Sequence, residues 1–204
     1  MKVVTLGPDD FARDCARLAQ RAAAFAPELL IGVRTGGYVV AQQLRERGFP
    51  SVPLLPLTRR RASTATKQAH PRLRALLPRL PYAVTDLLRR VEHGWLTRRE
   101  RAPMPAHWEP DADEFGAITR HVAAYSPARI LVVDDAVDSG ETLRAVVALM
   151  RQLAPGASVR AAAIVVTTDH PAIHPDFHLY AQTLCRFPWS HDFRLAPGAA
   201  VRPR

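Results

Sequence analysis

A chain of 204 residues with 48% hydrophobic content can bury one substantial core, most simply as one domain that carries an insertion. Two cysteines are too few for a disulfide framework, and apolar runs of about six residues are far below the roughly twenty that a membrane span needs. Composition therefore excludes a disulfide scaffold and a membrane protein. Met1–Leu6 is too short for a signal peptide, so we expect a soluble, cytoplasmic protein.

The first 57 residues alternate between helical and strand patterns. A stripe of small and apolar residues at helical spacing follows Asp9 and Asp10, either of which can cap the helix, and Pro27 ends it. Pro53 and Pro56 confine the last strand to the edge of a sheet. The expected elements are a helix over Asp9–Phe25, a strand over Leu29–Val33, a helix over Tyr38–Arg47 and a strand over Ser51–Leu57.

Residues 58–110 have a character of their own. They hold 12 Lys/Arg against 4 Asp/Glu, which accounts for a net charge of +8 out of +9 for the chain, together with six prolines that interrupt any helix. Short helices are expected over 73–80, 82–91 and 95–99. We interpret this region as a basic, Pro-rich helical insertion, or hood, within a single domain that spans residues 1–204.

The stretch Ile130–Ala145 organises the chain. Four apolar residues run into two carboxylates, Asp134 and Asp135, and then into a short polar turn that contains Gly140. This pattern predicts a buried strand whose carboxyl end opens into a loop at a helix N-terminus, where backbone N–H groups can bind phosphate. Adjacent carboxylates repel a phosphate unless they face a metal or sugar hydroxyls. A phosphorylated sugar with Mg²⁺ satisfies both halves of the loop.

The segments around Ile130–Ala145 alternate between helical and strand patterns, as the first 57 residues do. They predict an α/β fold with an open, mainly parallel, twisted sheet flanked by helices. The expected elements are a helix over Ala112–Tyr125 with Phe115, Ile118, Val122 and Tyr125 on its apolar face, a helix over Glu141–Leu153, a strand over Ser158–Thr167 and a strand over Leu179–Cys185.

The run from the apolar strand through two acidic residues to Asp138-Ser139-Gly140-Glu141-Thr142 closely resembles the signature of the type I phosphoribosyltransferases. These enzymes bind 5-phosphoribosyl 1-pyrophosphate (PRPP). A second strand, glycine turn and helix lies about a hundred residues earlier, and Ile31–Ala41 resembles the family's pyrophosphate loop. Thr35 stands where relatives usually carry a basic residue. The resemblance covers about residues 29–57 and 128–192.

The resemblance implies a role for each matching residue. Asp138 would act as the catalytic acid or base at N7 of a purine, and it can also cap the helix that follows. PRPP would be bound by two groups of residues, which are Asp134, Asp135, Asp138, Ser139, Gly140, Glu141 and Thr142, and upstream Arg34, Thr35, Gly36 and Gly37. The implied cofactor is Mg²⁺, with Asp134, Asp135 and Asp192 as its ligands.

The C-terminal segment resembles that of the hypoxanthine, guanine and xanthine phosphoribosyltransferases, because it carries Pro175-Asp176-Phe177 and then Phe187-Pro188-Trp189. The resemblance implies that the acceptor is bound by Val137, His170, Leu184, Cys185 and Trp189. His170 falls at the lysine that binds the 6-oxo group, and Leu184 falls at the aromatic residue that stacks on the purine. Imidazole does not enforce an oxo group, and leucine lacks stacking geometry, so these residues weaken the choice of base.

Three hypotheses follow. The leading one is transfer of the phosphoribosyl group from PRPP to a nucleobase, a 6-oxopurine first, by a cytoplasmic homodimer without membrane contact. The second is the same transfer to a non-nucleobase acceptor. The third is a nucleic-acid-binding regulator on this fold, which the basic insertion favours and the near-absence of interleaved aromatic residues disfavours.

Overall fold

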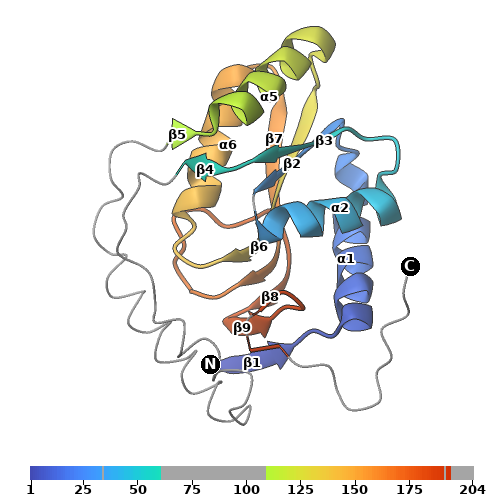
Figure 1. Ribbon diagram of the computed structural model, residues 1–204, viewed down its shortest axis with the longest axis vertical. Coiled ribbons are helices and arrows are strands. Elements are labelled where there is room, and N and C mark those ends of the chain that lie inside the picture. Colours follow the sequence, from blue (N-terminus) through green and yellow to red (C-terminus); the bar gives the residue numbers. More distant parts are fainter. Residues whose placement is uncertain (34, 61–108, 191, 194–204) are drawn as a thin grey trace.

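Five parallel strands form the central sheet of the computed structural model, in the order β3-β2-β6-β7-β8 (Figure 1). The structure describes residues 1–33, 35–60, 109–190 and 192–193. The strands are β2 (Leu29–Val33), β3 (Leu54–Leu57), β6 (Arg129–Val137), β7 (Ser158–Val166) and β8 (Phe177–Ala181). The predicted α/β sheet is thus confirmed, and the proline-containing strand β3 lies at its edge, as Pro53 and Pro56 indicate.

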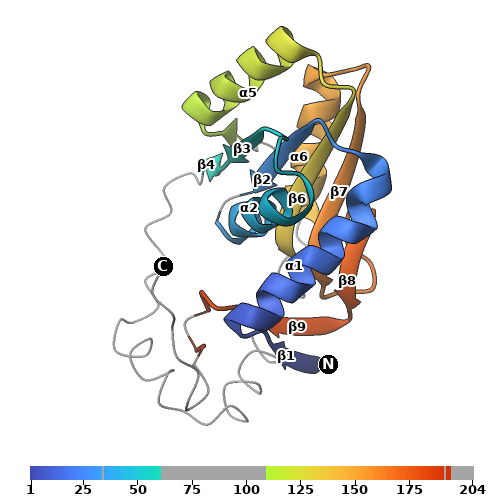
Figure 2. The same ribbon diagram turned by 90° about the vertical axis from the view of Figure 1, so that its right-hand side faces the viewer.

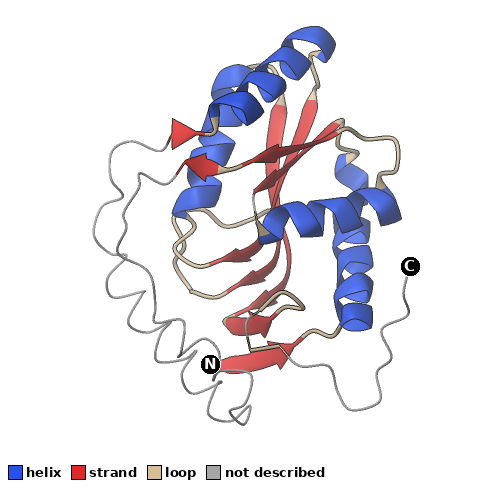
Figure 3. Ribbon diagram, in the orientation of Figure 1, coloured by secondary structure: helices blue, strands red, loops and turns tan. Residues whose placement is uncertain are grey.

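Helices cover both faces of this sheet (Figure 3). On β6, Leu131 and Val133 pack into one core with α1 (Pro8–Ala22) and α2 (Gly36–Gly48). Ile130 and Val132 pack into the other core with α5 (Ala112–Tyr125) and α6 (Glu141–Leu153). Side chains alternate across a strand, and both faces of these strands are apolar, so the sheet is buried between two helical layers.

Most predicted elements have the expected bounds. The ranges of β2, α5 and α6 are those predicted, α2 begins at Gly36 rather than Tyr38, and β7 ends at Val166. The α-helical part of α1 ends at Ala22 and a 3₁₀ turn, η1 (Ala23–Phe25), follows. The N-cap of α1 is Gly7 with Pro8 next, so Asp9 and Asp10 lie in the first turn instead of capping it.

Two predictions for apolar segments were wrong. Gln182 has a positive φ of 50°, so the strand expected over Leu179–Cys185 is broken there into β8 and β9 (Thr183–Arg186). Tyr125 is 73% exposed and packs against His121 at the end of α5, where the chain turns away from the core.

A second, two-stranded sheet consists of β9 and β1 (Lys2–Thr5), paired in parallel. It lies at one end of the molecule beside the start of α1, and the perpendicular view shows the same arrangement (Figure 2). Strand β1 was not predicted, because its four residues gain their partner only from the far end of the chain.

The ends of the basic insertion pair with each other. Strands β4 (Arg59–Arg60) and β5 (Glu109–Pro110) are antiparallel, and the Asp111 amide donates to the Thr58 carbonyl at 3.0 Å. The chain therefore leaves and re-enters the fold at one place. Arg34 and the helices expected over 73–80, 82–91 and 95–99 lie outside the described residues. Within the described part, no helix is long and apolar enough to cross a membrane.

Candidate active site

The two candidate loops meet at the carboxyl edge of the sheet. Strand β2 pairs directly with β6, with Gly32 opposite Val133, so the loop that ends at Gly36 and Gly37 lies beside the loop that follows β6. Strand β6 is longer than predicted, because it continues through Asp134 and Asp135 to Val137. The acidic pair is therefore held on a strand instead of in the loop.

The acidic pair packs against the two glycines at the start of α2. A Cβ atom at Gly36 would lie 2.1 Å from the Asp135 Oδ2 atom, and one at Gly37 would lie 2.6 Å from the Asp134 Cα atom and 2.7 Å from the Val133 carbonyl oxygen. At Gly37 the close atoms belong to the backbone of β6, so glycine is needed there, whereas a side chain at Gly36 would displace the Asp135 carboxylate. The described part of the predicted pyrophosphate loop and the acidic pair thus form one site.

Burial raises the pKa of both carboxyl groups in the pair, and the neighbouring negative charge of Asp135 raises that of Asp134 further. The Asp135 backbone N–H donates to the Asp134 Oδ1 atom at 2.9 Å, which fixes one carboxylate. Asp138 adds a third negative charge to the surroundings of the pair. A cation or the hydroxyl groups of a sugar would relieve this concentration of charge.

The phosphate loop, residues 138–140, joins β6 to α6. Gly140 adopts a φ of 76° and occupies the N-cap position of α6, so the unpaired N–H groups of the first turn face the loop. The Ser139 Oγ atom lies 3.5 Å from the Glu141 amide, at the limit of a hydrogen bond. Glu141 forms an ion pair with Arg144 at 2.6 Å, and Thr142 is half-buried.

Asp138 has a partner that the sequence did not suggest. The hydroxyl of Thr167, the first residue after β7, donates to the Asp138 Oδ1 atom at 2.6 Å. The signal was a polar residue at the end of an apolar strand next to β6, but the strand register needed to pair it with Asp138 comes from the structure.

The residues predicted to bind the acceptor lie in different parts of the fold. Val137 is buried in the core beside α6, and Cys185 is buried in the core beside α1. Leu184, its neighbour on β9, points to the opposite face because side chains alternate along a strand. Leu184 is therefore outside the core beside α1, although it is also buried.

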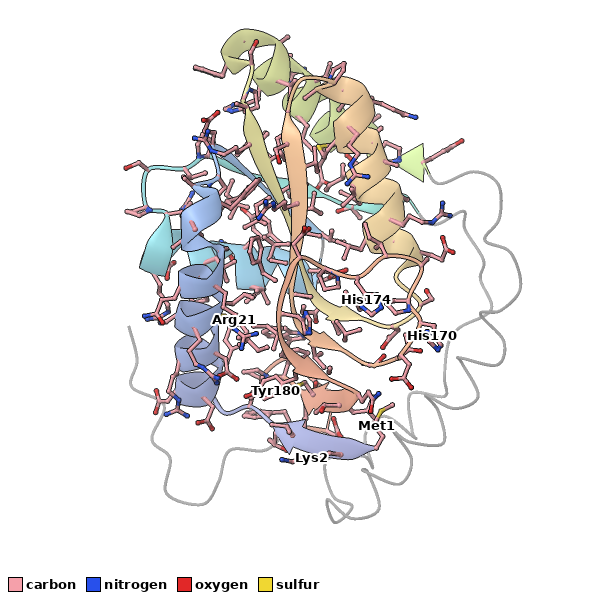
Figure 4. All side chains as sticks on the ribbon, turned by 180° about the vertical axis from the view of Figure 1, so that it is seen from behind. Met1, Lys2, Arg21, His170, His174 and Tyr180 are labelled. Atoms are coloured by element: carbon pink, nitrogen blue, oxygen red, sulfur yellow. The ribbon has the colours of Figure 1, made fainter. Side chains whose placement is uncertain are left out.

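Two further candidates lie closer to solvent. His170 is exposed on the loop after β7, where Figure 4 shows it near His174 and away from α1. Trp189 is 38% exposed and stacks on Phe187 with ring centroids 4.8 Å apart, while Phe11 contacts it edge-on at 5.1 Å. Packing against two phenylalanines fixes the orientation of the indole.

Asp192 forms a buried ion pair. Its Oδ2 atom lies 2.9 Å from the Nε atom of Arg186, which is 1% exposed and also donates to the Thr5 Oγ1 atom at 2.7 Å. This arrangement anchors the C-terminal segment to β1. Asp192, which the resemblance assigns to the metal, is thus paired with Arg186.

The described residues contain no cluster of three or more His, Cys, Asp or Glu side chains able to hold a metal ion. Asp134 and Asp135 nevertheless fit Mg²⁺, which proteins usually bind through one or two carboxylates while the phosphates of the ligand and water complete the octahedron. Mg²⁺ bound there would neutralise the charge of a pyrophosphate group.

These features define an α/β protein that binds a phosphorylated ligand across the carboxyl edge of a parallel sheet. Comparisons with known proteins give the family. The model of the phosphoribosyl transferase domain family matches residues 9–194. The chain belongs to the phosphoribosyltransferases, a class of glycosyltransferases that depend on PRPP, and the predicted type I fold is confirmed.

Three solved structures have a similar fold. A purine phosphoribosyltransferase from Pyrococcus horikoshii Ot3 has a TM-score of 0.56 at 17% identity, with 96% of this chain and 99% of that chain covered. The xanthine-guanine-hypoxanthine phosphoribosyltransferase of Helicobacter pylori has a TM-score of 0.54 at 16% identity, covering 92% and 93%. A hypothetical protein from Neisseria gonorrhoeae with bound ppGpp has a TM-score of 0.55 at 16% identity, covering 92% and 89%. A comparison with curated protein sequences found no match.

Proposed function

We propose that this protein transfers the 5-phosphoribosyl group of PRPP to a nucleobase, a 6-oxopurine in the first instance, and releases pyrophosphate. One observation carries the proposal, namely the close packing of Asp134 and Asp135 against Gly36 and Gly37 beside the phosphate loop. This arrangement brings a pyrophosphate cradle, a pair of carboxylates and a phosphate loop to one edge. Two of the three similar folds belong to purine phosphoribosyltransferases, in agreement with this choice of acceptor.

In the proposed complex the 5-phosphate of PRPP accepts hydrogen bonds from backbone N–H groups at the start of α6 and from the hydroxyls of Ser139 and Thr142. The pyrophosphate lies against Gly36 and Gly37, where the absence of side chains lets it approach the backbone. Asp192, the third carboxylate that the resemblance assigns to the metal, is buried in its ion pair with Arg186. The carboxylates of Asp134 and Asp135 would hold the ribose hydroxyls and Mg²⁺. Their charge also stabilises the positive charge that develops on the sugar during transfer.

Asp138 acts on the acceptor in this proposal. Its carboxylate takes the proton at N7 of the purine, or gives it back in the reverse direction, as another ring nitrogen forms the bond to C1 of the ribose. Asp138 is exposed to solvent at the head of the phosphate loop, so both PRPP and a base can reach it. Leu184 and Trp189 then provide apolar cover for the ring.

One observation favours a second candidate, the transfer to a non-nucleobase acceptor. Thr167 stands at the end of β7 and His170 is exposed on the loop beyond it, so the described residues present no lysine to a 6-oxo group there. A regulator that binds nucleic acid through the basic insertion is the third candidate, and it concerns residues outside the described part of the chain.

A panel assay separates these candidates. Pyrophosphate release from PRPP and Mg²⁺ is measured with hypoxanthine, guanine, xanthine, adenine, pyrimidines and non-nucleobase amines. We expect turnover with at least one 6-oxopurine. Turnover confined to another acceptor supports the second candidate, whereas no turnover and a salt-dependent shift of RNA or DNA supports the third.

The assembly is proposed from the family resemblance, and the location from the composition of the chain. We expect a homodimer, which light scattering behind size-exclusion chromatography tests directly, in the cytoplasm. Neither cysteine forms a disulfide and both are buried, which agrees with a reducing compartment.

A further inference from the structure

The segment after β7 is built against the phosphate loop. The Thr167 amide donates to the Val137 carbonyl at 2.9 Å, and the Ala172 amide donates to the Ser139 carbonyl at 2.7 Å. Between these two bonds, a Cβ atom at Gly140 would lie 3.0 Å from the Ala172 amide nitrogen. The backbone from Thr167 to Ala172 therefore braces the loop from behind.

The Thr167 hydroxyl lies at the start of this brace. Its oxygen is 2.6 Å from the Asp138 Oδ1 atom and 3.4 Å from the Val137 carbonyl oxygen. A hydroxyl donates one proton, and the shorter contact to a charged acceptor is the stronger bond, so the proton goes to Asp138. Thr167 is 3% exposed and its backbone is hydrogen-bonded, whereas Asp138 is exposed on a loop. The buried, fixed residue thus orients the exposed one.

We propose that Thr167 is the positioning residue for Asp138, and that its hydroxyl sets the plane of the carboxylate toward the acceptor. A neutral donor suits this role, because it restricts rotation of the carboxylate without cancelling the charge that a base needs. The family resemblance implies that His170 contacts the acceptor, whereas the contact between Thr167 and Asp138 follows from the pairing of β6 with β7. This inference rests on the proposed phosphoribosyl transfer.

The test compares variants that differ in the hydroxyl. Thr167→Val keeps the β-branched shape and removes the donor, and we expect kcat with the best base to fall by about ten- to a hundredfold, the value of a hydrogen bond to a charged group. KM for PRPP should change by less than about twofold, because the phosphate loop keeps its backbone bonds. Thr167→Ser, which keeps the hydroxyl, should recover kcat to within about threefold of wild type.

Two controls make the result specific. Thr168→Val removes the hydroxyl of the next residue in the chain, which is half-buried, and it should leave kcat unchanged. Adding Thr167→Val to Asp138→Asn should produce no further loss, since the two residues act as a unit. Where Thr167→Val lowers the melting temperature strongly, Thr167→Ala and Thr167→Ser form the matched pair, because both lack the methyl group and only the serine keeps the hydroxyl.

The outcomes distinguish the two proposals. A wild-type enzyme that turns over no base overturns the proposed function and this inference with it. An active wild type whose Thr167→Val and Thr167→Ala variants retain full kcat overturns the inference alone. A loss that Thr167→Ser does not restore, or a rise in KM for PRPP with kcat unchanged, also contradicts it, because a merely structural role predicts those results.

Discussion

Substitution of Gly37 by alanine tests the packing on which the candidate site depends. The new Cβ atom would lie 2.6 Å from the Asp134 Cα atom and 2.7 Å from the Val133 carbonyl oxygen. Both neighbours are backbone atoms of β6, the strand at the centre of the main sheet, so neither can rotate away. Either α2 moves away from β6 or the acidic pair shifts.

The expected cost follows from this geometry. Forcing an extra carbon into a packed site costs about 1–3 kcal/mol, whereas alanine gains at most about 1 kcal/mol of helix propensity over glycine. In a domain of this size 1 kcal/mol lowers the melting temperature by about 2–4 °C, so Gly37→Ala should melt several degrees below wild type. Affinity for Mg²⁺ and PRPP should fall by about tenfold or more, because the cradle and the carboxylates no longer meet.

Gly156→Ala is the matched control. Among the described residues, no atom beyond the chain neighbours of Gly156 lies within 4 Å of its Cβ position, and Gly156 is in the turn after α6. Its melting temperature should stay at or slightly above that of wild type. Thermal unfolding and calorimetric titration with PRPP in the presence of Mg²⁺ measure both quantities. Equal melting temperatures and equal affinities for Gly37→Ala and Gly156→Ala would show that the packing of Gly37 against β6 does not hold the site together.

Three further predictions concern buried charge. The raised pKa of Asp135 means that the folded state holds its proton more tightly than the unfolded state, so the free energy of unfolding falls as the pH rises above the usual carboxyl range. Asp135→Asn should therefore raise the melting temperature at pH 7–8 and weaken PRPP binding. A lower melting temperature would contradict this prediction. Arg186→Met should lower the free energy of unfolding in urea by about 3–5 kcal/mol, because it leaves Asp192 without this cation. Adding Asp192→Leu should recover most of this loss. A free energy of unfolding for Arg186→Met within about 0.5 kcal/mol of wild type would contradict the prediction. Burial and a hydrogen bond to Asp14 raise the pKa of Tyr180 to about 12. Tyr180 therefore stabilises the fold below pH 10 and loses that contribution as the pH approaches 12. In alkaline unfolding, Tyr180→Phe should not show this loss of stability.

Local pattern was enough to predict three elements with their bounds, whereas α2 begins earlier and β6 extends further than predicted. The apolar run of β2, the helical spacing of α5 and the turn before α6 each depend on neighbours in sequence, and their bounds were predicted correctly. The close approach of Gly36 and Gly37 to the acidic pair could be expected once both loops were placed at one edge. The distances between the Cβ positions of these glycines and the acidic pair depend on the register of β2 and β6, which the structure supplies.

Features that depend on distant partners could not be predicted. Strand β1 exists because β9 lies beside it, and the break at Gln182 needs a positive φ in a residue that gives no local signal for one. The Arg186–Asp192 ion pair forms because the chain turns back within six residues, which composition does not reveal. Thr167 meets Asp138 only through the pairing of β6 with β7.

Phosphoribosyl transfer by Asp138 is measured by the rate of nucleoside 5-monophosphate formation from PRPP, Mg²⁺ and the best 6-oxopurine, compared between the wild type and Asp138→Asn. The substitution keeps the size of the side chain and removes the group that accepts a proton. We expect the wild type to form the nucleotide and the variant to do so about a hundred- to ten-thousandfold more slowly, with PRPP affinity retained. Nucleotide formation at equal rates by both proteins, or by neither, would contradict the account.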